Sequence, residues 1–218
     1  MQGSGAATLR VSEIFFSLQG EASRVGLPTV FVRLTGCPLR CVYCDTDYAF
    51  SGGESLSLDA ILDRVQAFPT RHVTVTGGEP LAQRACLDLL SRLCDAGLDV
   101  SLETSGALDI APVDARVARI VDLKTPASGE VARNLGSNIA HLTPRDELKF
   151  VLADADDYAW AVEQIRQHRL AARCALLFSA VHGQLSPTQL ADWILRDGLP
   201  VRLQVQLHKL LWTEARGK

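Results

Sequence analysis

The fold is decided by the stretch HVTVTGGEPLAQRACLDLLSRLCDAGLDVSLET, residues 72–104. Its first part, His72–Thr76, is rich in β-branched residues and predicts a buried strand. Pro80 then begins a helix, and Gly97 ends it. A second strand is expected at Asp99–Thr104. A strand, a helix and a strand in this order predict two parallel neighbours of one sheet, joined by a crossover helix.

The same alternation continues through the rest of the chain. Further strands are expected at 29–35, 119–124, 147–153, 173–181 and 201–206, and further helices at 57–68, 154–168 and 187–196. Two connections, 105–118 and 125–146, contain Gly and Pro among polar residues, so a full helix is not expected in either. The pattern predicts an α/β fold, a reduced and incomplete TIM-like (β/α) barrel of about six parallel strands with fewer helices. In such folds ligands collect at the C-terminal ends of the strands.

Size and charge restrict the classes of function. The 218 residues suffice for one domain with its own core, expected at 11–218, after a small and polar stretch at 1–10 that we expect to be a disordered leader. The formal net charge is −3 and no dense Lys/Arg stripe is present, so a nucleic-acid partner is not expected. No apolar run is long enough to cross a bilayer, so neither is a membrane partner, and a cytoplasmic location is expected.

Three cysteines lie close together, directly after the strand expected at 29–35. Cys37, Cys41 and Cys44 have the spacing Cys-x3-Cys-x2-Cys. Three thiolates at this spacing can bind one face of a four-iron cluster and leave one iron without a protein ligand, which is the open position that a catalytic metal needs. The remaining cysteines are scattered through segments expected to be core, and they match no second cluster.

A zinc site and a redox pair are the rival roles for the triplet. A structural zinc site needs four ligands, and no fourth Cys or His is near; Asp45 or Asp47 could serve, but acidic ligands are unusual in such sites. A redox pair of Cys41 and Cys44 would leave Cys37 without a role. The iron–sulfur cluster is therefore the preferred hypothesis.

Two motifs resemble the signatures of the radical S-adenosylmethionine (radical SAM) superfamily. The cysteine triplet has Tyr43 just before its last member, and Thr76–Pro80 (TGGEP) resembles the second motif. The resemblance implies a [4Fe-4S] cluster whose open iron chelates S-adenosyl-L-methionine, with Tyr43 near the adenine. Glycines allow close approach of the backbone to the ligand, and Glu79 can balance its ammonium group. For Ser105, a turn residue at the end of a strand is about as good an explanation as a contact with this cofactor. The other residues expected to contact this cofactor are Asp45, Gly78, Ser105, Asp122 and Lys124.

The segments around these motifs resemble the 7-carboxy-7-deazaguanine synthase family over about residues 11–210. They are EIFFSLQGE (13–21), FVRLTGCPLRC (31–41), CDT (44–46) and QLHK (206–209). The resemblance implies a lyase that contracts the ring of 6-carboxy-5,6,7,8-tetrahydropterin, with release of ammonia, on the route to queuosine and related 7-deazapurines. It also implies a flavodoxin-like electron donor. A homodimer is expected from the family and from the open sheet edge of an incomplete barrel.

The chemistry of the substrate residues that this resemblance implies suits a pterin carboxylate. Arg33 can form paired hydrogen bonds with the carboxylate, although a structural ion pair accounts for Arg33 equally well. Gln19 and Glu21 can bind the guanine-like edge, and would otherwise belong to a solvated loop. Thr46 is the implied Mg²⁺ ligand, with water and the substrate carboxylate completing the shell. The other implied substrate residues are Leu18, Gly20, Thr76 and His208, of which His208 would otherwise lie at a surface strand end.

Alternatives to this function remain. An activase uses the same cofactor to take hydrogen from a glycine of a partner protein; it shares the cysteine spacing and, loosely, residues 18–21. Arg33 and the segments 44–46 and 206–209 favour the pterin. A non-catalytic metal-binding module does not account for the glycine-rich strand end. The chain departs from the family at Lys124, where Lys-Thr-Pro replaces Ser-Pro-Lys-Pro. The motifs contain no His placed for acid–base catalysis, so no catalytic side chain is expected.

Overall fold

The computed structural model describes residues 7–212 and residue 217. Within them, one sheet of nine strands has the order β3-β1-β2-β4-β5-β6-β7-β8-β9. From β2 through β4 to β9 each strand is parallel to its neighbour, whereas β1 is antiparallel to β2 and β3. The strands are β1 Thr8–Leu18, β2 Pro28–Leu34, β3 Glu54–Ser57, β4 His72–Gly77, β5 Asp99–Thr104, β6 Ala118–Asp122, β7 Glu147–Leu152, β8 Ala175–Ala180 and β9 Arg202–Gln204.

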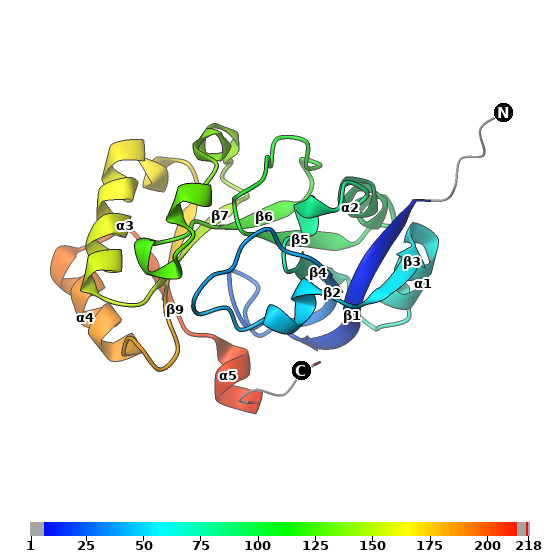
Figure 1. The fold of residues 1–218 in the computed structure, drawn as a ribbon, viewed down its shortest axis with the longest axis horizontal. Coiled ribbons are helices and arrows are strands. Elements are labelled where there is room, and N and C mark those ends of the chain that lie inside the picture. Colours follow the sequence, from blue (N-terminus) through cyan, green and yellow to red (C-terminus); the bar gives the residue numbers. More distant parts are fainter. Residues whose placement is uncertain (1–6, 213–216, 218) are drawn as a thin grey trace.

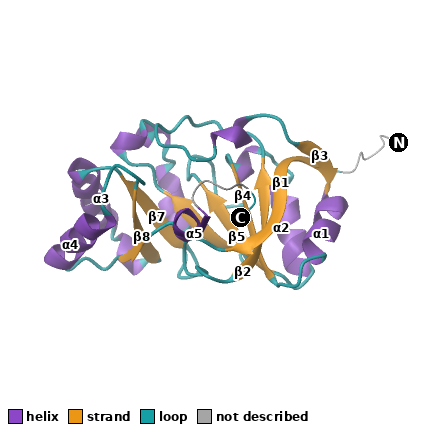
Figure 2. Ribbon diagram, turned by 90° about the horizontal axis from the view of Figure 1, so that it is seen from below, coloured by secondary structure: helices purple, strands orange, loops and turns teal. Residues whose placement is uncertain are grey.

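Four of the α-helices lie in two groups at opposite ends of this curved, open sheet, and the last one, α5, lies apart from both (Figures 1 and 2). Figures 1 and 2 show α1 and α2 beside β1 to β5, and α3 and α4 beside β7 and β8. The predicted α/β partial barrel is thereby confirmed. The connections after β5 and after β6 contain no α-helix, as their Gly and Pro residues predict. The helices are α1 Leu58–Gln66, α2 Cys86–Asp95, α3 Ala155–His168, α4 Pro187–Asp197 and α5 Leu207–Trp212.

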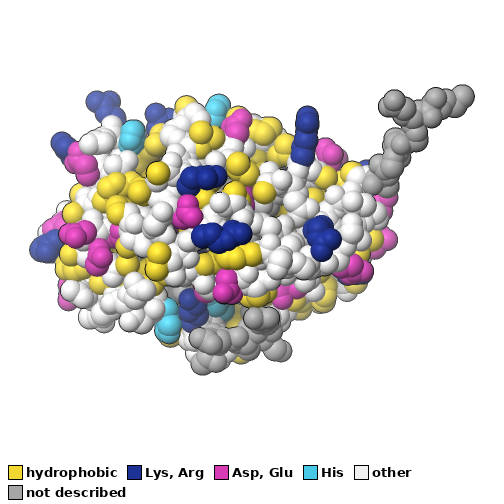
Figure 3. All heavy atoms as spheres, viewed as in Figure 1, with side chains coloured by type: hydrophobic (Ala, Val, Ile, Leu, Met, Phe, Trp, Pro, Cys, Tyr) yellow, Lys and Arg dark blue, Asp and Glu magenta, His cyan; other side chains and the backbone are white. Residues whose placement is uncertain are grey.

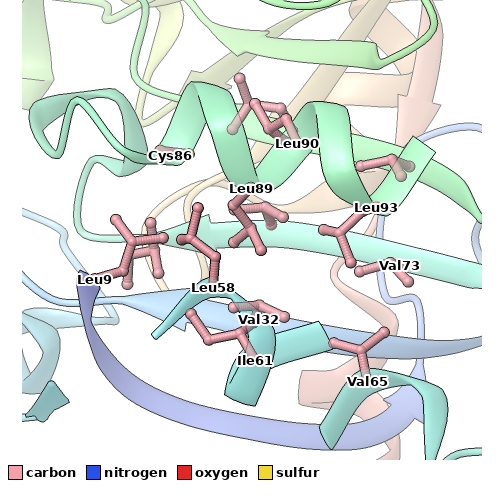
Figure 4. Close-up of a cluster of buried hydrophobic side chains, with 14 of the residues drawn as sticks. Leu9, Val32, Leu58, Ile61, Val65, Val73, Cys86, Leu89, Leu90 and Leu93 are labelled. Atoms are coloured by element: carbon pink, nitrogen blue, oxygen red, sulfur yellow. The ribbon is translucent and has the colours of Figure 1, made fainter. Parts of the chain in front are cut away.

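The strands β4 and β5 each have an apolar outer face and a polar inner face, because side chains alternate along a strand. In β4, Val73 and Val75 join the apolar cluster that α1 and α2 cover, and part of this cluster is drawn in Figure 4. A second cluster lies between α3, α4 and the strands β7 and β8. The alternate residues of β4, Thr74 and Thr76, contact their counterparts on β5 on the inner face. The interior is therefore polar at β4 and β5, and a small apolar cluster lies beside it on β6 and β8.

Three expectations about element ends are wrong. The leader expected at 1–10 is too long, since β1 already begins at Thr8; residues 1–6 lie outside the described part. The helix expected from Pro80 starts as a 3₁₀ turn, and α2 begins only at Cys86. The last strand is shorter than expected, and His208 lies in α5 rather than at a surface strand end.

Candidate active site

The cysteine loop follows β2 and crosses the middle of the face seen in Figure 1. Its three thiols are free and half-buried. Arg40 fixes the shape of the loop, because its Nη1 donates to the carbonyls of Cys37 at 2.8 Å and Leu39 at 2.6 Å. The guanidinium also stacks on Phe50, 4.3 Å from the ring centre. On the same face, Figure 3 shows basic and acidic side chains interspersed, without a basic stripe.

Burial, neighbouring carboxylates and one lysine act on the pKa values of the three thiols. Burial raises the pKa of Cys37, Cys41 and Cys44, and the Lys124 ammonium partly opposes this at each of them. A metal that binds here must therefore displace protons. Among residues 7–212, no three His, Cys, Asp or Glu side chains converge on a point where one ion could sit. A structural zinc site would need such convergence, whereas the thiolates of a four-iron cluster bind separate irons.

The glycine turn after β4 packs directly against the cysteine loop. The N–H of Gly78 donates to the carbonyl of Leu34 at 3.2 Å, and the N–H of Glu79 donates to that of Gly36 at 2.8 Å. A Cβ on Gly78 would overlap the Gly36 oxygen and lie 2.8 Å from the Cβ of Cys37. Only glycine fits at this position, so the two motifs that the sequence separates form one structure.

Glu79 differs from its expected role as a partner of the cofactor's ammonium group. Its side chain is fully buried, and both carboxylate oxygens already accept hydrogen bonds from the protein. The donors are the N–H of Leu81 at 3.0 Å, the Thr104 hydroxyl at 2.9 Å, the N–H of Ser105 at 2.7 Å and the Ser105 hydroxyl. The structure thus assigns Glu79 to holding the ends of β4 and β5 together. The Ser105 hydroxyl, expected at the cofactor, donates its proton to this bond.

Asp122 and Lys124, at the end of β6, have the chemistry expected for cofactor contacts. Lys124 Nζ lies 2.9 Å from Asp122 Oδ2. The other oxygen, Oδ1, is buried and has no hydrogen-bond partner in the described chain. A buried acceptor without a donor is costly, so this oxygen fits a ligand hydroxyl such as those of a ribose. The residues present therefore suit a nucleoside cofactor beside the cysteines.

Tyr43 lies at the same end of the sheet, as expected for a residue near the adenine. Its hydroxyl donates to the carbonyl of Val151 at 3.2 Å and is 3.3 Å from the Thr125 hydroxyl. Burial raises the pKa of Tyr43 to about 12, so the phenol stays neutral. Thr125 in turn donates to Asp157 of α3 at 2.8 Å. Helix α3 thereby holds Thr125, the residue that the Tyr43 hydroxyl contacts.

Gln19 is buried inside the barrel rather than in a solvated loop. Its amide nitrogen donates to Thr74 Oγ1 at 3.1 Å and to Glu103 Oε1 at 3.2 Å. The second oxygen of Glu103 accepts from the Thr76 hydroxyl at 2.9 Å. Burial raises the pKa of the Glu103 carboxyl, and the nearby Glu21 raises it further. Glu103 is a site residue that the motifs missed, although its place two residues after Ser101 in the alternating strand VSLET marks it as inward-facing.

Glu21 faces the same interior and is held by three side chains. Lys149 Nζ lies 2.5 Å from Glu21 Oε2, which also accepts from Gln204 at 3.4 Å. Gln206 donates to Oε1 at 2.8 Å, which leaves one lone pair of Oε1 for another donor. Burial acts to raise the pKa of Glu21, but the charge and hydrogen bond of Lys149 outweigh it and the pKa is lowered. Lys149 is the second residue that the motifs missed.

Arg33 has the protein partner that a structural ion pair requires. Its Nε donates to Glu13 Oε1 of β1 at 2.7 Å. The guanidinium carbon lies 5.9 Å from the ring centres of both Phe15 and Tyr48. Neither Nη atom donates to any described residue, so the outer edge of the guanidinium is left for a carboxylate. In the register of the sheet Arg33 lies beside Thr76, and thus next to Glu103.

The C-terminal segment joins the loop after β1, residues 19–27, to the cysteine loop. The N–H of Leu207 donates to the carbonyl of Gly20 at 3.0 Å, and a Cβ on Gly20 would lie 2.5 Å from His208 Nδ1. Lys209 Nζ lies 3.0 Å from Asp45 Oδ2. Burial acts to raise the pKa of Asp45, but Lys209 and the hydroxyl of Thr46 lower it to about 2. The Asp45 side chain thus faces α5, and only its backbone remains for the expected cofactor contact.

Most of the expected residues therefore belong to one connected region at the C-terminal ends of the parallel strands, which we call the opening. The structure brings together the cysteines, the glycine turn and the β6 end on one side of it, and the loop 19–27 with α5 on the other. Leu18, the last residue of β1, leads into the loop 19–27 and is half-buried. Thr46 is half-buried, and its hydroxyl donates to Asp45 at 3.0 Å.

Comparisons with known proteins agree with this geometry. The sequence model of the Radical SAM superfamily matches residues 31–170. A 7-carboxy-7-deazaguanine synthase of Chlorobaculum tepidum is 48% identical over 218 residues, which cover 98% of this chain and 99% of that protein. A synthase of the same name from Koribacter versatilis is 44% identical over 225 residues, covering 96% and 100%.

Two solved structures resemble the fold. QueE from Escherichia coli superposes with a TM-score of 0.76 at 23% identity, over 92% of this chain and 95% of that one. SuiB of Streptococcus suis bound to S-adenosylmethionine superposes with a TM-score of 0.53 at 11% identity, over 81% of this chain and 47% of that one. At these identities the likeness concerns the fold alone. No described helix of this chain is long and apolar enough to span a bilayer.

Proposed function

The chain belongs to the 7-carboxy-7-deazaguanine synthases of the radical SAM superfamily, and we propose that it catalyses the reaction named by this family. It would contract the ring of 6-carboxy-5,6,7,8-tetrahydropterin, release ammonia and yield 7-carboxy-7-deazaguanine. The observation that carries the proposal is the polar interior beneath the cysteine loop. Gln19 and Thr76 both donate hydrogen bonds to Glu103 there, and Arg33 lies beside Thr76 in the sheet. A planar heterocycle with a carboxylate matches this set.

The cysteine side of the opening is proposed to hold the cofactors. Cys37, Cys41 and Cys44 would bind the [4Fe-4S] cluster, and the orphaned Asp122 Oδ1 would accept from the ribose of S-adenosylmethionine. When bound, these groups supply the carbon radical that removes a hydrogen atom from the substrate. The protein's own part is to hold the substrate in position and to exclude water.

Side chains on the other side of the opening are proposed to bind the N–H groups and the carboxylate of the pterin. Glu103 and Glu21 each retain acceptor lone pairs, which suit the ring and exocyclic N–H groups. The two Nη atoms of Arg33 suit the substrate carboxylate, because Nε alone is occupied by Glu13. The observed Glu13 pair therefore orients Arg33 and does not compete with this role.

A magnesium ion is proposed at Thr46. The hydroxyl of Thr46 gives its proton to Asp45, so its lone pairs remain available to a cation. Mg²⁺ usually takes few protein ligands and keeps waters, which a half-buried hydroxyl near the opening permits. The substrate carboxylate would complete the contact.

The partners are proposed on chemical grounds. Forming the radical needs an external one-electron donor, for which a flavodoxin-like protein is proposed, and free cysteines favour a reducing, cytoplasmic location. A homodimer is proposed because β3 and β9 each pair on one side only, which leaves open edges of the kind that proteins cover.

Anaerobic turnover of the cluster-reconstituted protein tests the proposal. With carboxytetrahydropterin, S-adenosylmethionine and a chemical reductant, we expect a deazaguanine product and ammonia, and a lower rate when Mg²⁺ is removed. Cys41→Ala should lose both the cluster absorbance and the product, whereas Cys94→Ala, on the half-buried side of α2, should keep both. Cleavage of S-adenosylmethionine without any deazaguanine would refute the substrate and leave the superfamily assignment intact.

A further inference from the structure

Lys149 of β7 is a charged side chain inside the barrel that has no role in the function proposed above. Its side chain is 14% exposed, and it lies 2.5 Å from Glu21 and 3.9 Å from Asp122. The two carboxylates belong to opposite sides of the opening, since Glu21 is held by Gln206 of the C-terminal segment and the charge of Asp122 acts on Cys41. Lys149 is therefore the cation that links both sides.

Stability does not account for this lysine. Burying an ammonium and a carboxylate costs desolvation that their attraction often fails to offset, and an apolar residue of similar size is commonly as stable or more stable. The neighbouring core positions on the outer face of β7, Leu148 and Phe150, are apolar. A lysine kept at an inner position is better understood through what it does to its partners.

The surroundings of Glu21 show what Lys149 does there. The charged or titratable groups that face Glu21 are Lys149 from β7, Glu103 from β5, Asp45 from the cysteine loop and His208 from α5. Gln204 and Gln206 supply only neutral donors, at 3.4 Å and 2.8 Å. Lys149 is thus the only cation in direct contact with Glu21 among the described residues.

Resting on the proposed function, we propose that Lys149 is a positioning residue for pterin binding, which holds the Glu21 carboxylate ionised and aimed into the interior. Through Asp122 the same ammonium connects this carboxylate to the cofactor side. Without it, Glu21 is a buried carboxylate beside Glu103, and protonation turns one of its acceptor oxygens into a donor. The substrate N–H group then loses its acceptor.

A double-mutant cycle tests the proposal through the pterin dissociation constant, measured anaerobically on cluster-reconstituted protein. We expect Lys149→Met to weaken pterin binding about tenfold or more, as loss of a charge-assisted hydrogen bond does. Glu21→Gln should weaken it similarly, and the double variant should be no weaker than the weaker single variant. Lys149→Arg, which keeps the charge, should restore most of the affinity.

The pH dependence separates positioning from simple support of the fold. Because Lys149 keeps Glu21 ionised, any pH dependence of the wild-type affinity between about pH 6 and pH 8 should come from Glu103, whose pKa is raised by burial. In Lys149→Met the affinity should fall more steeply than in wild type as the pH is lowered through this range, because the pKa of the uncompensated Glu21 carboxyl is raised as well. Arg119→Met is the matched control, since it breaks a buried ion pair, with Asp146 at 2.6 Å, at the N-terminal ends of β6 and β7. It should lower stability and leave the pterin affinity and its pH profile unchanged.

The outcomes are distinct. A folded Lys149→Met protein that binds pterin within about twofold of wild type, or an additive cycle, overturns the role of Lys149. If Lys149→Met does not fold, the double variant, in which Glu21 is no longer an unpaired charge, and Lys149→Arg still provide the comparison. Wild-type protein that fails to bind the pterin at all overturns the proposed function instead.

Discussion

The Glu79 carboxylate accepts the backbone N–H of Ser105 at 2.7 Å and also the hydroxyl of the same residue. This pair joins the turn after β4 to the end of β5, and Thr104 and Leu81 complete it. A motif glutamate expected at the cofactor is thus part of the frame on which the cofactor's neighbours are fixed.

Replacing Glu79 by Gln should lower the stability of the cluster-free protein by about 2 kcal/mol, because an amide offers one acceptor oxygen where the carboxylate accepts from four groups. Urea unfolding measures this. Glu163→Gln, which breaks an exposed pair with Arg166, is the control and should cost far less. Unchanged stability together with lost S-adenosylmethionine binding would return Glu79 to the role of a ligand.

Replacing Gly78 by Ala should reduce the iron bound per chain, because the new Cβ would overlap the Gly36 oxygen and displace the loop of Cys37. Iron and sulfide analysis after reconstitution measures it. Gly136→Ala is the matched control, since nothing lies within 4 Å of the Cβ it would add. Equal iron content in both variants would contradict the close packing of the two motifs.

Replacing Arg33 by Met should weaken pterin binding roughly 10- to 100-fold, because a paired, charge-assisted contact to the carboxylate is lost. Affinity for S-adenosylmethionine should not change. Arg24→Met removes an arginine of similar exposure, 17% against 16%, whose partner Asp99 is the first residue of β5, at the opposite end of that strand from Glu103. If both variants bound pterin like wild type, Arg33 would be a structural residue only.

Replacing Glu103 by Gln should stabilise the protein at about pH 8 while it weakens pterin binding. Burial raises the folded-state pKa of Glu103, so the folded state favours the protonated form, and that contribution to stability is lost as the pH rises through the folded pKa. A neutral Gln avoids this loss. Urea unfolding at about pH 8 and about pH 4 should show the advantage of the variant shrinking at the lower pH. A variant less stable than wild type at the higher pH would contradict this.

The parallel strands and the cysteine site are predictable from the sequence because their signals are local. Strand and helix periodicities, with Gly and Pro between them, locate β4, α2 and β5, and three closely spaced cysteines indicate a cluster. The inward-facing residues Glu103 and Lys149 follow the same period of two, but their partners depend on the register of distant strands. Which residue contacts Lys149 cannot be found without that register.

The strand β1 shows most clearly what local sequence patterns do not predict. It pairs antiparallel with β2 and supplies Glu13 to Arg33, which the pattern of a parallel barrel gives no reason to expect. Likewise, the short segment after β9 forms a helix because it packs on Gly20 and Asp45, residues that come far earlier in the chain. Tertiary contacts decide such elements, and local propensity does not.

The cysteine loop is held in shape by contacts with residues that come much later in the chain. The loop ends near residue 46, yet the N–H of Val42 donates to Ser128 at 3.0 Å, and Asp157 of α3 holds that segment through Ala127 at 2.9 Å. Lys209 closes the loop from the other side. A nascent chain that has just exposed its cysteines therefore lacks these contacts, and we expect iron and sulfide to be bound only by a chain that is almost complete.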